Sequence, residues 1–330
     1  MTRGTLAALL VGAALALGLA LWCGLDGVTA ALARAGWLGL VAVTAFHVIP
    51  KALCGAAWSR LVPGARLGEF MWFRWLRDAA NDMLGIVPAA GELAAIRAMT
   101  RRRLDAAVAA GATVVDLTLE MAAQCAFIAL VLALVVVARP DGRLVALAGI
   151  GLAIMALLLA GLVAAQHLGW VRLIDRVAGR LSAELGAALA LKLERLQAAI
   201  GAIYAERGRV RGAVALHVAA WLVGIGEGWI GLTMIGVSTG GIDIVMLECA
   251  AFILRSAGFA LPGAIGIQEG GYVLMAPLLG IPAEAALALS LLKRGREVAL
   301  GVPGCIAWQL AESGWWWRGR RTTRTPGEIA

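Results

Sequence analysis

Long apolar stretches separated by short charged ones dominate the chain. A helix needs about 20 mostly apolar residues to cross the hydrocarbon core of a bilayer. The stretches that approach or exceed this length cover residues 5–22, 36–58, 105–138, 144–165, 212–237 and 284–311. The first of them is long for the apolar part of a signal peptide and ends at Trp22, so we expect it to be a retained helix. The pattern predicts an all-α fold, a polytopic transmembrane helical bundle.

Two further regions are rich in apolar residues but interrupted. Residues 60–103 contain eight arginines and a break at Pro88, and residues 244–280 are divided at Arg255 and Pro262. We expect each region to form a pair of short helices with a break between them. The broken pair is either re-entrant or part of a discontinuous spanning helix. Irregular backbone persists at membrane depth only where protein or a water-filled cavity satisfies its polar groups.

One segment is clearly amphipathic. Between residues 172 and 207, leucine and isoleucine recur at three- and four-residue steps or their multiples, and arginine and glutamate occupy other faces. This spacing predicts one or two helices that either lie on the cytoplasmic leaflet or pack against the bundle. We expect a single transmembrane domain over 1–312, with an amphipathic cytoplasmic segment at about 170–211, and a basic cytoplasmic tail at 313–330.

The composition supports this class of protein and excludes others. Hydrophobic residues make up 61% of the 330 residues and charged residues 15%, and the mean hydropathy is +0.86. An ordinary soluble enzyme has nearer ~25% charged residues. The net charge of +8 is spread among apolar stretches, which argues against nucleic acid as a partner. The five cysteines are scattered singly, so we expect no disulfide framework, no metal site and no cofactor.

The distribution of basic residues predicts an orientation. If the N-terminus is cytoplasmic and each broken region returns to its starting side, the cytoplasmic segments hold eight basic residues in 60–103, eight in 170–211 and four in 318–324. The opposite side holds three. This positive-inside bias predicts a multi-pass protein of the bacterial inner membrane with both termini in the cytoplasm.

Several charged residues fall within the apolar segments, where each costs roughly 2.5–3.5 kcal/mol on insertion scales. They are Lys51, Asp116, Glu120, Glu227, Glu248, Arg255, Glu269, Lys293, Arg294, Arg296 and Glu297. Asp116, Glu120 and Gln124 are four residues apart and therefore share one helix face. We expect this stripe to face the interior and to pair with intramembrane arginines, either as a structural link between helices or as part of a site.

The two breaks carry similar residues. In each, an arginine precedes a proline and glycine, and a glutamate follows in the next helix. Half-helix ends near the bilayer midplane form the substrate site in many transporters, and helix N-termini and arginine both attract phosphate. We expect Glu92 and Glu269 to face one cavity of net positive potential, with Arg77, Arg97 and Arg294 as counter-charges. The candidate substrate-binding residues are Arg77, Asn81, Pro88, Gly91, Glu92, Arg97, Arg255, Pro262, Gly266, Glu269 and Arg294.

These motifs carry a family resemblance. They comprise Asn81, Pro88–Glu92, Arg97, Leu261–Gly270 and Leu291–Arg294. Over roughly residues 5–312 the chain resembles the transmembrane region of the lysylphosphatidylglycerol synthase superfamily, which implies a lipid flippase or flippase-like protein. We expect no synthase activity, since the soluble aminoacyl-transferring domain of the larger members has no counterpart here. Arg294–Glu297, Pro303–Gly304 and Ala307–Gln309 are similar to the branch associated with hopanoid biosynthesis.

Motifs of enzymes are missing from the sequence. His47, His167 and His217 are isolated, and neither HExxH nor a Walker A motif occurs. We expect no catalytic residues and a protein that is not an enzyme. The predicted function is movement of a polar lipid (phospholipid, glycolipid or hopanoid) between leaflets. The alternative is a non-transporting membrane subunit that scaffolds lipid-modifying enzymes. The expected partners are membrane lipids and enzymes of lipid or hopanoid biosynthesis.

Overall fold

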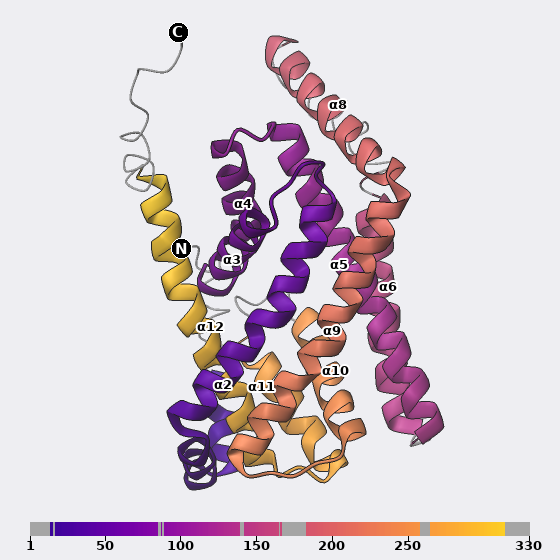
Figure 1. The fold of residues 1–330 in the computed structure, drawn as a ribbon. Helices are drawn as coiled ribbons and strands as arrows, with labels where there is room; N and C mark the ends of the chain where they lie inside the picture. The colour runs from indigo at the N-terminus through magenta and orange to yellow at the C-terminus, as the bar shows by residue number, and fades with distance from the viewer. Residues whose placement is uncertain are drawn as a thin grey trace.

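The described part of the chain is helical throughout its regular elements, as the sequence predicts (Figure 1). The computed structural model describes residues 14–15, 17–84, 87, 89–138, 142–164, 166, 183–257 and 265–313. The helices are α2 (Leu25–Arg60), α3 (Leu67–Met83), α4 (Ala90–Arg101), α5 (Ala106–Ala138), α6 (Gly142–Ala164), α8 (Ala183–Ala205), α9 (Arg207–Ile235), α10 (Gly241–Ala257), α11 (Ile267–Met275), the 3-10 helix η3 (Ala276–Leu279) and α12 (Ala283–Glu312).

Within the described residues, three helices, α2, α5 and α9, are long and apolar enough to cross a membrane, and they coincide with three of the expected spans. Helix α6 adds a shorter apolar stretch, Gly149–Ala164. The span expected at 284–311 corresponds to α12. Helix α12 is continuous, but four charged residues between Lys293 and Glu297 occupy its middle. The first expected span, 5–22, lies largely outside the described residues.

Helix α2 begins at Leu25, well before the span expected at 36–58. Arg34 interrupts the apolar pattern there, and its side chain is hydrogen-bonded to another helix. Its Nε donates a hydrogen bond of 2.8 Å to the carbonyl of Ile235, at the end of α9. The last carbonyls of a helix have no partner within the helix, so Arg34 satisfies one of them. The helix bends at Gly36, whose φ of 53° lies in the left-handed region that favours glycine.

Both interrupted regions form helical hairpins. Helix α3 packs against α4, and α10 packs against α11. The four helices contain 17, 12, 17 and 9 residues, which is fewer than the ~20 needed to cross the hydrocarbon core. Figure 1 shows the first hairpin in the upper half of the molecule and the second in the lower half. The two hairpins therefore lie toward opposite ends of the molecule, and their re-entrant arrangement in a membrane stays a prediction.

The amphipathic segment is described from residue 183 onward, as helix α8. Near its end, Ile200 and Ile203 are buried. Gly111 of α5 lies against Ile200, so α8 packs closely on the bundle there. Leu191, nearer its start, is exposed. The second half of α8 therefore packs against the bundle, which is one of the two arrangements predicted for this segment. Residues 167–182 lie outside the described part of the chain.

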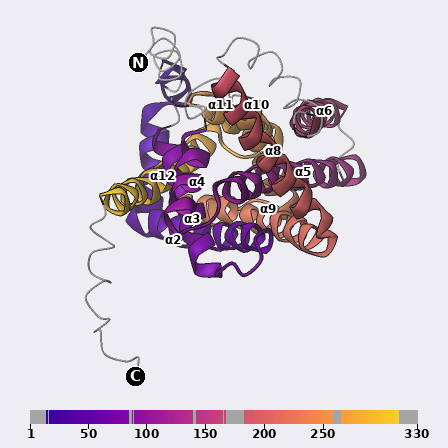
Figure 2. The ribbon, with the colours of Figure 1, turned by 90° about the horizontal axis from the view of Figure 1, so that it is seen from above.

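Small residues bring the long helices together. Helices α2 and α9 pack closely, and Gly226 leaves space for the ring of Phe46, into which any Cβ would project. Figure 2 shows α3 and α4 enclosed between α12 and α5. Large apolar side chains such as Trp37, Val137 and Leu157 are exposed on the outside. The polar residues of the hairpins therefore lie inside a bundle whose outer surface is largely apolar.

Candidate functional site

A cavity of about 580 Å³ lies between the two hairpins and the long helices. Its polar wall comes from α2, α3, α4, α5, α9, α10, α11 and α12 and comprises His47, Lys51, Arg74, Arg77, Asp78, Asn81, Asp82, Glu92, Glu120, Gln124, Glu227, Arg255, Gln268, Tyr272, Lys293, Arg296 and Glu297. Trp221, Phe252 and Met121 supply an apolar section. The cavity therefore combines many ionisable groups with an apolar face, inside a bundle that contains three helices able to cross a membrane.

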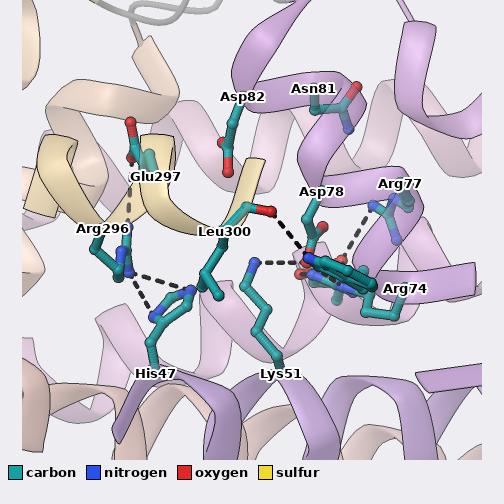
Figure 3. A network of polar contacts seen from close by, with 12 residues as sticks. His47, Lys51, Arg74, Arg77, Asp78, Asn81, Asp82, Arg296, Glu297 and Leu300 are labelled. Atoms are coloured by element: carbon teal, nitrogen blue, oxygen red, sulfur yellow. Dashed lines mark hydrogen bonds and ion pairs between the residues drawn. The ribbon is translucent and has the colours of Figure 1, made fainter. Parts of the chain in front are cut away.

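Helix α3 supplies one side of the cavity because its charged residues fall on one face. Arg74, Asp78 and Asp82 are four residues apart, and Arg77 and Asn81 fill the adjacent row, which is the spacing of neighbours on an α-helix. Phe70 and Phe73 continue these two rows one turn nearer the start of the helix, where they pack into the core. Figure 3 shows the α3 side chains directed toward those of α2 and α12.

The first cluster of ion pairs, which we call the N-terminal cluster, links α2, α3, α4 and α5. It consists of Lys51, Arg74, Arg77, Asp78, Glu92, Asp116 and Glu120. Arg74 binds both oxygens of Glu120, at 2.6 and 3.0 Å. Arg77 donates to Glu92 and Asp116, each at 3.0 Å, and to Glu120 at 3.2 Å. The stripe expected on α5 therefore faces the interior, as predicted. Its partners are Arg74 and Arg77 of the first interrupted region, and not the arginines of the apolar segments that the prediction named.

The break between α3 and α4 is tied into this cluster. The backbone N–H of Gly91 donates to Asn81 Oδ1 at 2.8 Å, and Asn81 Nδ2 donates to Glu92 at 3.2 Å. A Cβ at position 91 would collide with the carbonyl of Arg77 and the side chain of Asn81. Only glycine permits this approach, so Gly91 fixes how closely the two helices meet. Pro88 lies outside the described residues.

The second cluster, the C-terminal cluster, links α2, α9, α10, α11 and α12. It consists of His47, Glu227, Glu248, Arg255, Gln268, Glu269, Lys293, Arg294, Arg296 and Glu297. Lys293 Nζ lies 2.6 Å from Glu248, which also accepts a hydrogen bond of 3.0 Å from the hydroxyl of Tyr272. Arg296 donates to Glu227 at 2.9 Å. The charges in the middle of α12 are therefore inside the protein and paired.

The second break resembles the first in its contacts. Glu269 is the third residue of α11, as Glu92 is of α4. One oxygen of Glu269 accepts a hydrogen bond of 2.7 Å from the N–H of Gly266, and the other accepts one of 2.9 Å from Arg294. Gly266 has a φ of 83°, which glycine adopts without strain. In the second hairpin Glu269 thus joins the backbone directly to an arginine, whereas in the first Glu92 pairs with Arg77 and reaches the backbone of Gly91 through Asn81.

Arg255 of α10 links the C-terminal cluster to Asp82 at the end of α3. Its Nη1 lies 2.5 Å from Glu297 and from Gln268, and its Nη2 lies 3.5 Å from Asp82 at the end of α3. Gln268 in turn donates to Ser290 of α12 at 3.0 Å. The ends of α3 and α10, each followed by a break, are therefore connected through one guanidinium group.

The charge of the cavity wall corrects one sequence expectation. The wall contains six acidic and six basic side chains apart from His47. These are Asp78, Asp82, Glu92, Glu120, Glu227 and Glu297 on one hand, and Lys51, Arg74, Arg77, Arg255, Lys293 and Arg296 on the other. The predicted net positive potential is wrong, because buried carboxylates accompany the cations that the sequence places at membrane depth.

The predicted site residues divide into three groups. Arg77, Asn81, Glu92 and Arg255 line the cavity. Gly91, Gly266, Glu269 and Arg294 lie at the breaks or behind the wall, so the expectation that Glu92 and Glu269 both face one cavity holds for Glu92 alone. Pro88 and Pro262 lie outside the described residues.

The prediction that Arg97 binds substrate is wrong. Its side chain is 60% exposed and pairs with Glu312 at 2.8 Å, near the end of α12, rather than lining the cavity. Arg101, one turn further along α4, also binds Glu312, at 2.6 Å. The four-residue spacing puts Arg97 and Arg101 on one helix face, away from Glu92. This face joins α4 to the end of α12 on the outside of the molecule.

Several wall residues were not among the predicted site residues. The sequence marked Lys51, Glu120, Glu227, Lys293, Arg296 and Glu297 as costly charges without assigning them to a site. Asp78 and Asp82 could have been predicted, because their spacing places them on the polar face of α3. His47 could not, since a single histidine in an apolar helix has no characteristic spacing. His47 Nδ1 lies 2.5 Å from Glu227, from a helix distant in sequence.

A second, smaller cavity of about 230 Å³ adjoins the first. It lies between α2, α3 and α12 and is lined by apolar parts of Val48, Met71, Trp75 and Leu300. Six residues belong to the walls of both cavities, namely His47, Lys51, Asp78, Asp82, Arg296 and Glu297. Figure 3 looks into this shared wall. A polar chamber and a largely apolar one are therefore separated by charged side chains alone.

One group of side chains has the composition of a metal site. Ligand atoms of Cys54, Glu120 and His217 lie within 4.8 Å of one another. Both oxygens of Glu120 already accept hydrogen bonds from arginine, and His217 Nε2 lies 3.0 Å from Asp116. We therefore treat these residues as the deep end of the N-terminal cluster and assign no metal to them.

One of three comparisons with known proteins identifies a family. The sequence model of the family described as Lysylphosphatidylglycerol synthase TM region matches residues 9–304. This range contains both hairpins and every residue of the cavity wall. No curated protein and no solved structure matches the chain.

Proposed function

Because the chain belongs to the lysylphosphatidylglycerol synthase TM region family and is a membrane protein, we propose that it moves a polar lipid between the two leaflets. In this account the headgroup passes through the charged cavity, and the acyl chains stay in the apolar surroundings. The cargo would be a phospholipid, a glycolipid or a hopanoid. The protein would reside in the bacterial inner membrane, with the basic end of α4 and the adjoining end of α12 in the cytoplasm, and would carry out no chemical reaction.

The observation that carries the proposal is an open space lined by charge. Twelve charged side chains surround a cavity of about 580 Å³. Ionic groups at membrane depth are costly, and links between helices need no space around them. A chamber that keeps these groups accessible is what a headgroup needs in order to leave water without entering hydrocarbon.

The cavity also lies at the meeting point of two hairpins that enter from opposite ends of the molecule (Figure 1). Broken helices in corresponding places of two halves are typical of transporter substrate sites. Arg77 and Arg255, which precede the two breaks, both line the chamber. This arrangement favours transport over a scaffold, which would require no internal polar site.

The test is lipid translocation in proteoliposomes. Purified protein is reconstituted with phospholipids that carry a fluorescent acyl chain, and dithionite then measures how much label reaches the outer leaflet. Gly224 lines the cavity, and a Cβ there would meet nothing within 4 Å. Gly224→Trp should therefore fill the chamber without disturbing the helix and lower translocation at least tenfold.

The control is the same substitution at an open position elsewhere. Gly161 of α6 is exposed, and a Cβ there would also meet nothing within 4 Å. Gly161→Trp should translocate lipid at the wild-type rate. Wild-type vesicles that behave like protein-free vesicles would contradict the proposal and favour the scaffold. Equal rates for Gly224→Trp and wild type would show that lipid does not use this cavity.

A further inference from the structure

The ion pair between Asp82 and Arg255 combines a long distance with exposure. The Arg255 Nη2–Asp82 Oδ1 distance is 3.5 Å, whereas Lys51–Asp78, Arg74–Glu120 and Arg255–Glu297 are 2.5–2.6 Å. The similarly long pairs Arg296–Glu297 and Lys293–Glu227, at 3.4 and 4.0 Å, have side chains that are at most 9% exposed. The side chains of Arg255 and Asp82 are 34% and 24% exposed. In Figure 3, Asp82 points into the space between Glu297 and Asp78. This pair is loose and accessible, and a ligand can separate it most easily.

The charge balance of the wall restricts what can separate that pair. Every charged group of the wall already has a counter-charge, which in some cases lies behind the wall, as Glu248 does for Lys293 and Asp116 for Arg77. A purely anionic headgroup that took Arg255 would leave Asp82 unpaired beside Glu297, and a purely cationic one that took Asp82 would leave Arg255 with less compensation. Removing one partner of a buried pair is strongly unfavourable. A headgroup with both signs avoids either loss.

Such a headgroup would exchange partners with the protein. Its phosphate would accept hydrogen bonds from Arg255, whose planar guanidinium suits two phosphate oxygens. Its ammonium would replace that guanidinium beside Asp82. Arg255 Nη1 would keep Glu297 and Gln268, so only Nη2 changes partner. The single pair between Asp82 and Arg255 is replaced by one pair of each residue with the headgroup, so neither residue is left without a counter-charge.

The smaller cavity, of about 230 Å³, offers apolar contacts to the part of an acyl chain nearest the headgroup. Asp82 and Lys51 belong to both walls, so a headgroup at Asp82 is adjacent to the space lined by Val48, Met71 and Trp75. Burial of an acyl chain against such side chains is favourable. A free headgroup would forgo this contribution, so the arrangement suits an intact phospholipid.

We propose that Asp82 and Arg255 form the headgroup site for a zwitterionic phospholipid, with Arg255 binding the phosphate and Asp82 the ammonium group. The assignment rests on the proposed lipid movement and specifies its substrate class. Lipids that carry a net charge are then not preferred substrates. Two such lipids are anionic phosphatidylglycerol and its lysyl ester, which is net cationic.

The experiment compares lipids of different headgroup charge. Phosphatidylethanolamine, phosphatidylglycerol and lysylphosphatidylglycerol, each with the same fluorescent acyl chain, are tested in the proteoliposome assay. Binding of each lipid to the purified protein is measured in parallel by native mass spectrometry, in the presence and absence of free glycerophosphoethanolamine. Wild-type protein should move and bind phosphatidylethanolamine at least tenfold better than either charged lipid, and the free headgroup should compete weakly.

Asp82→Asn should remove this preference, because an amide cannot balance the ammonium group. Asp82→Glu keeps the carboxylate and should retain the preference. Asp26→Asn, at the exposed start of α2, is the matched control and should resemble wild type. Monodisperse elution and an unchanged helical circular dichroism spectrum show that each variant is folded. If Asp82→Asn does not fold, Asp82→Glu and the wild-type lipid comparison still decide the matter.

Two failures are distinguishable. If lipids cross the bilayer with no preference for phosphatidylethanolamine, or with a preference for a charged lipid, the headgroup assignment is wrong and the proposed function stands. If phosphatidylethanolamine binds selectively but no lipid crosses, the assignment stands and the proposed function is wrong. Strong competition by the free headgroup would overturn the role given to the smaller cavity.

Discussion

Arg77 is the residue on which the N-terminal cluster depends. Its guanidinium contacts three carboxylates, on Glu92, Asp116 and Glu120, and its Cζ lies 5.7 Å from the ring centroid of Trp58. Planar donors in several directions are a property of arginine that lysine lacks. One side chain therefore holds α3, α4 and α5 together at the first break.

Arg77→Gln should lower the free energy of unfolding in detergent by about 3–5 kcal/mol, since it leaves buried carboxylates without their cation. Arg77→Lys should recover only part of that loss. Thermal unfolding followed by circular dichroism measures both. The exposed pair of Arg209 with Glu206, at 3.9 Å, is the control, and Arg209→Gln should change stability by less than ~1 kcal/mol. Similar losses for Arg77→Gln and Arg209→Gln would refute the structural role of Arg77.

Gly91 gives a second test at the residue scale. Gly91→Ala should destabilise the protein by about 1–3 kcal/mol, because the new methyl group collides with Arg77 and Asn81. Gly201→Ala, in α8 with open space around it, should instead stabilise by about 0.5–1 kcal/mol. The same unfolding assay compares them. A stabilising Gly91→Ala would mean that the hairpin is more open than described.

The sequence identified many of these residues but not their partners. The cost of charge in hydrocarbon was sufficient to single out Asp116, Glu120 and the charges of α12. It could not reveal that Arg97 turns outward to Glu312, because Arg97 and Glu92 share a short helix and only the packing of α12 distinguishes their faces. It also could not anticipate that the wall is electrically balanced, which depends on residues from eight helices meeting around one space.

At the scale of elements, the two hairpins determine how the chain is arranged. Helices α3 and α10 run inward from opposite ends, and each stops where its polar groups find partners in the other half (Figure 1). The breaks were predictable from proline, glycine and arginine. The course of α2 was not, because Arg34 interrupts its apolar pattern and is satisfied by a carbonyl of α9.

Cysteine labelling tests the re-entrant arrangement. In a variant whose five cysteines are replaced by alanine or serine, Arg66→Cys and Ala106→Cys flank the first hairpin, and Ser238→Cys and Leu278→Cys flank the second. All four positions are exposed. A membrane-impermeant maleimide should label the first two from the cytoplasmic side and the last two from the opposite side. Labelling of Arg66→Cys and Ala106→Cys from different sides would mean that the first hairpin spans the membrane.

At the scale of the whole molecule, the account describes an apolar bundle built around a charged chamber. The class of fold and the membrane location followed from hydropathy, and the family match over 9–304 agrees with them. The chamber itself was only partly predictable. Its position follows from the breaks, whereas its volume, its apolar neighbour and the link through Arg255 depend on how the helices pack.

Photo-crosslinking tests the central claim, that a lipid headgroup occupies the charged cavity, most directly. A phospholipid with a photoreactive group in its headgroup is added to the reconstituted protein, and the sample is irradiated. Mass spectrometry then identifies the modified peptides. The account predicts adducts on cavity residues such as Met121, Trp221 and Phe252, and their loss in Gly224→Trp. Adducts confined to outward-facing residues such as Trp37 and Val137, and unchanged in Gly224→Trp, would contradict it.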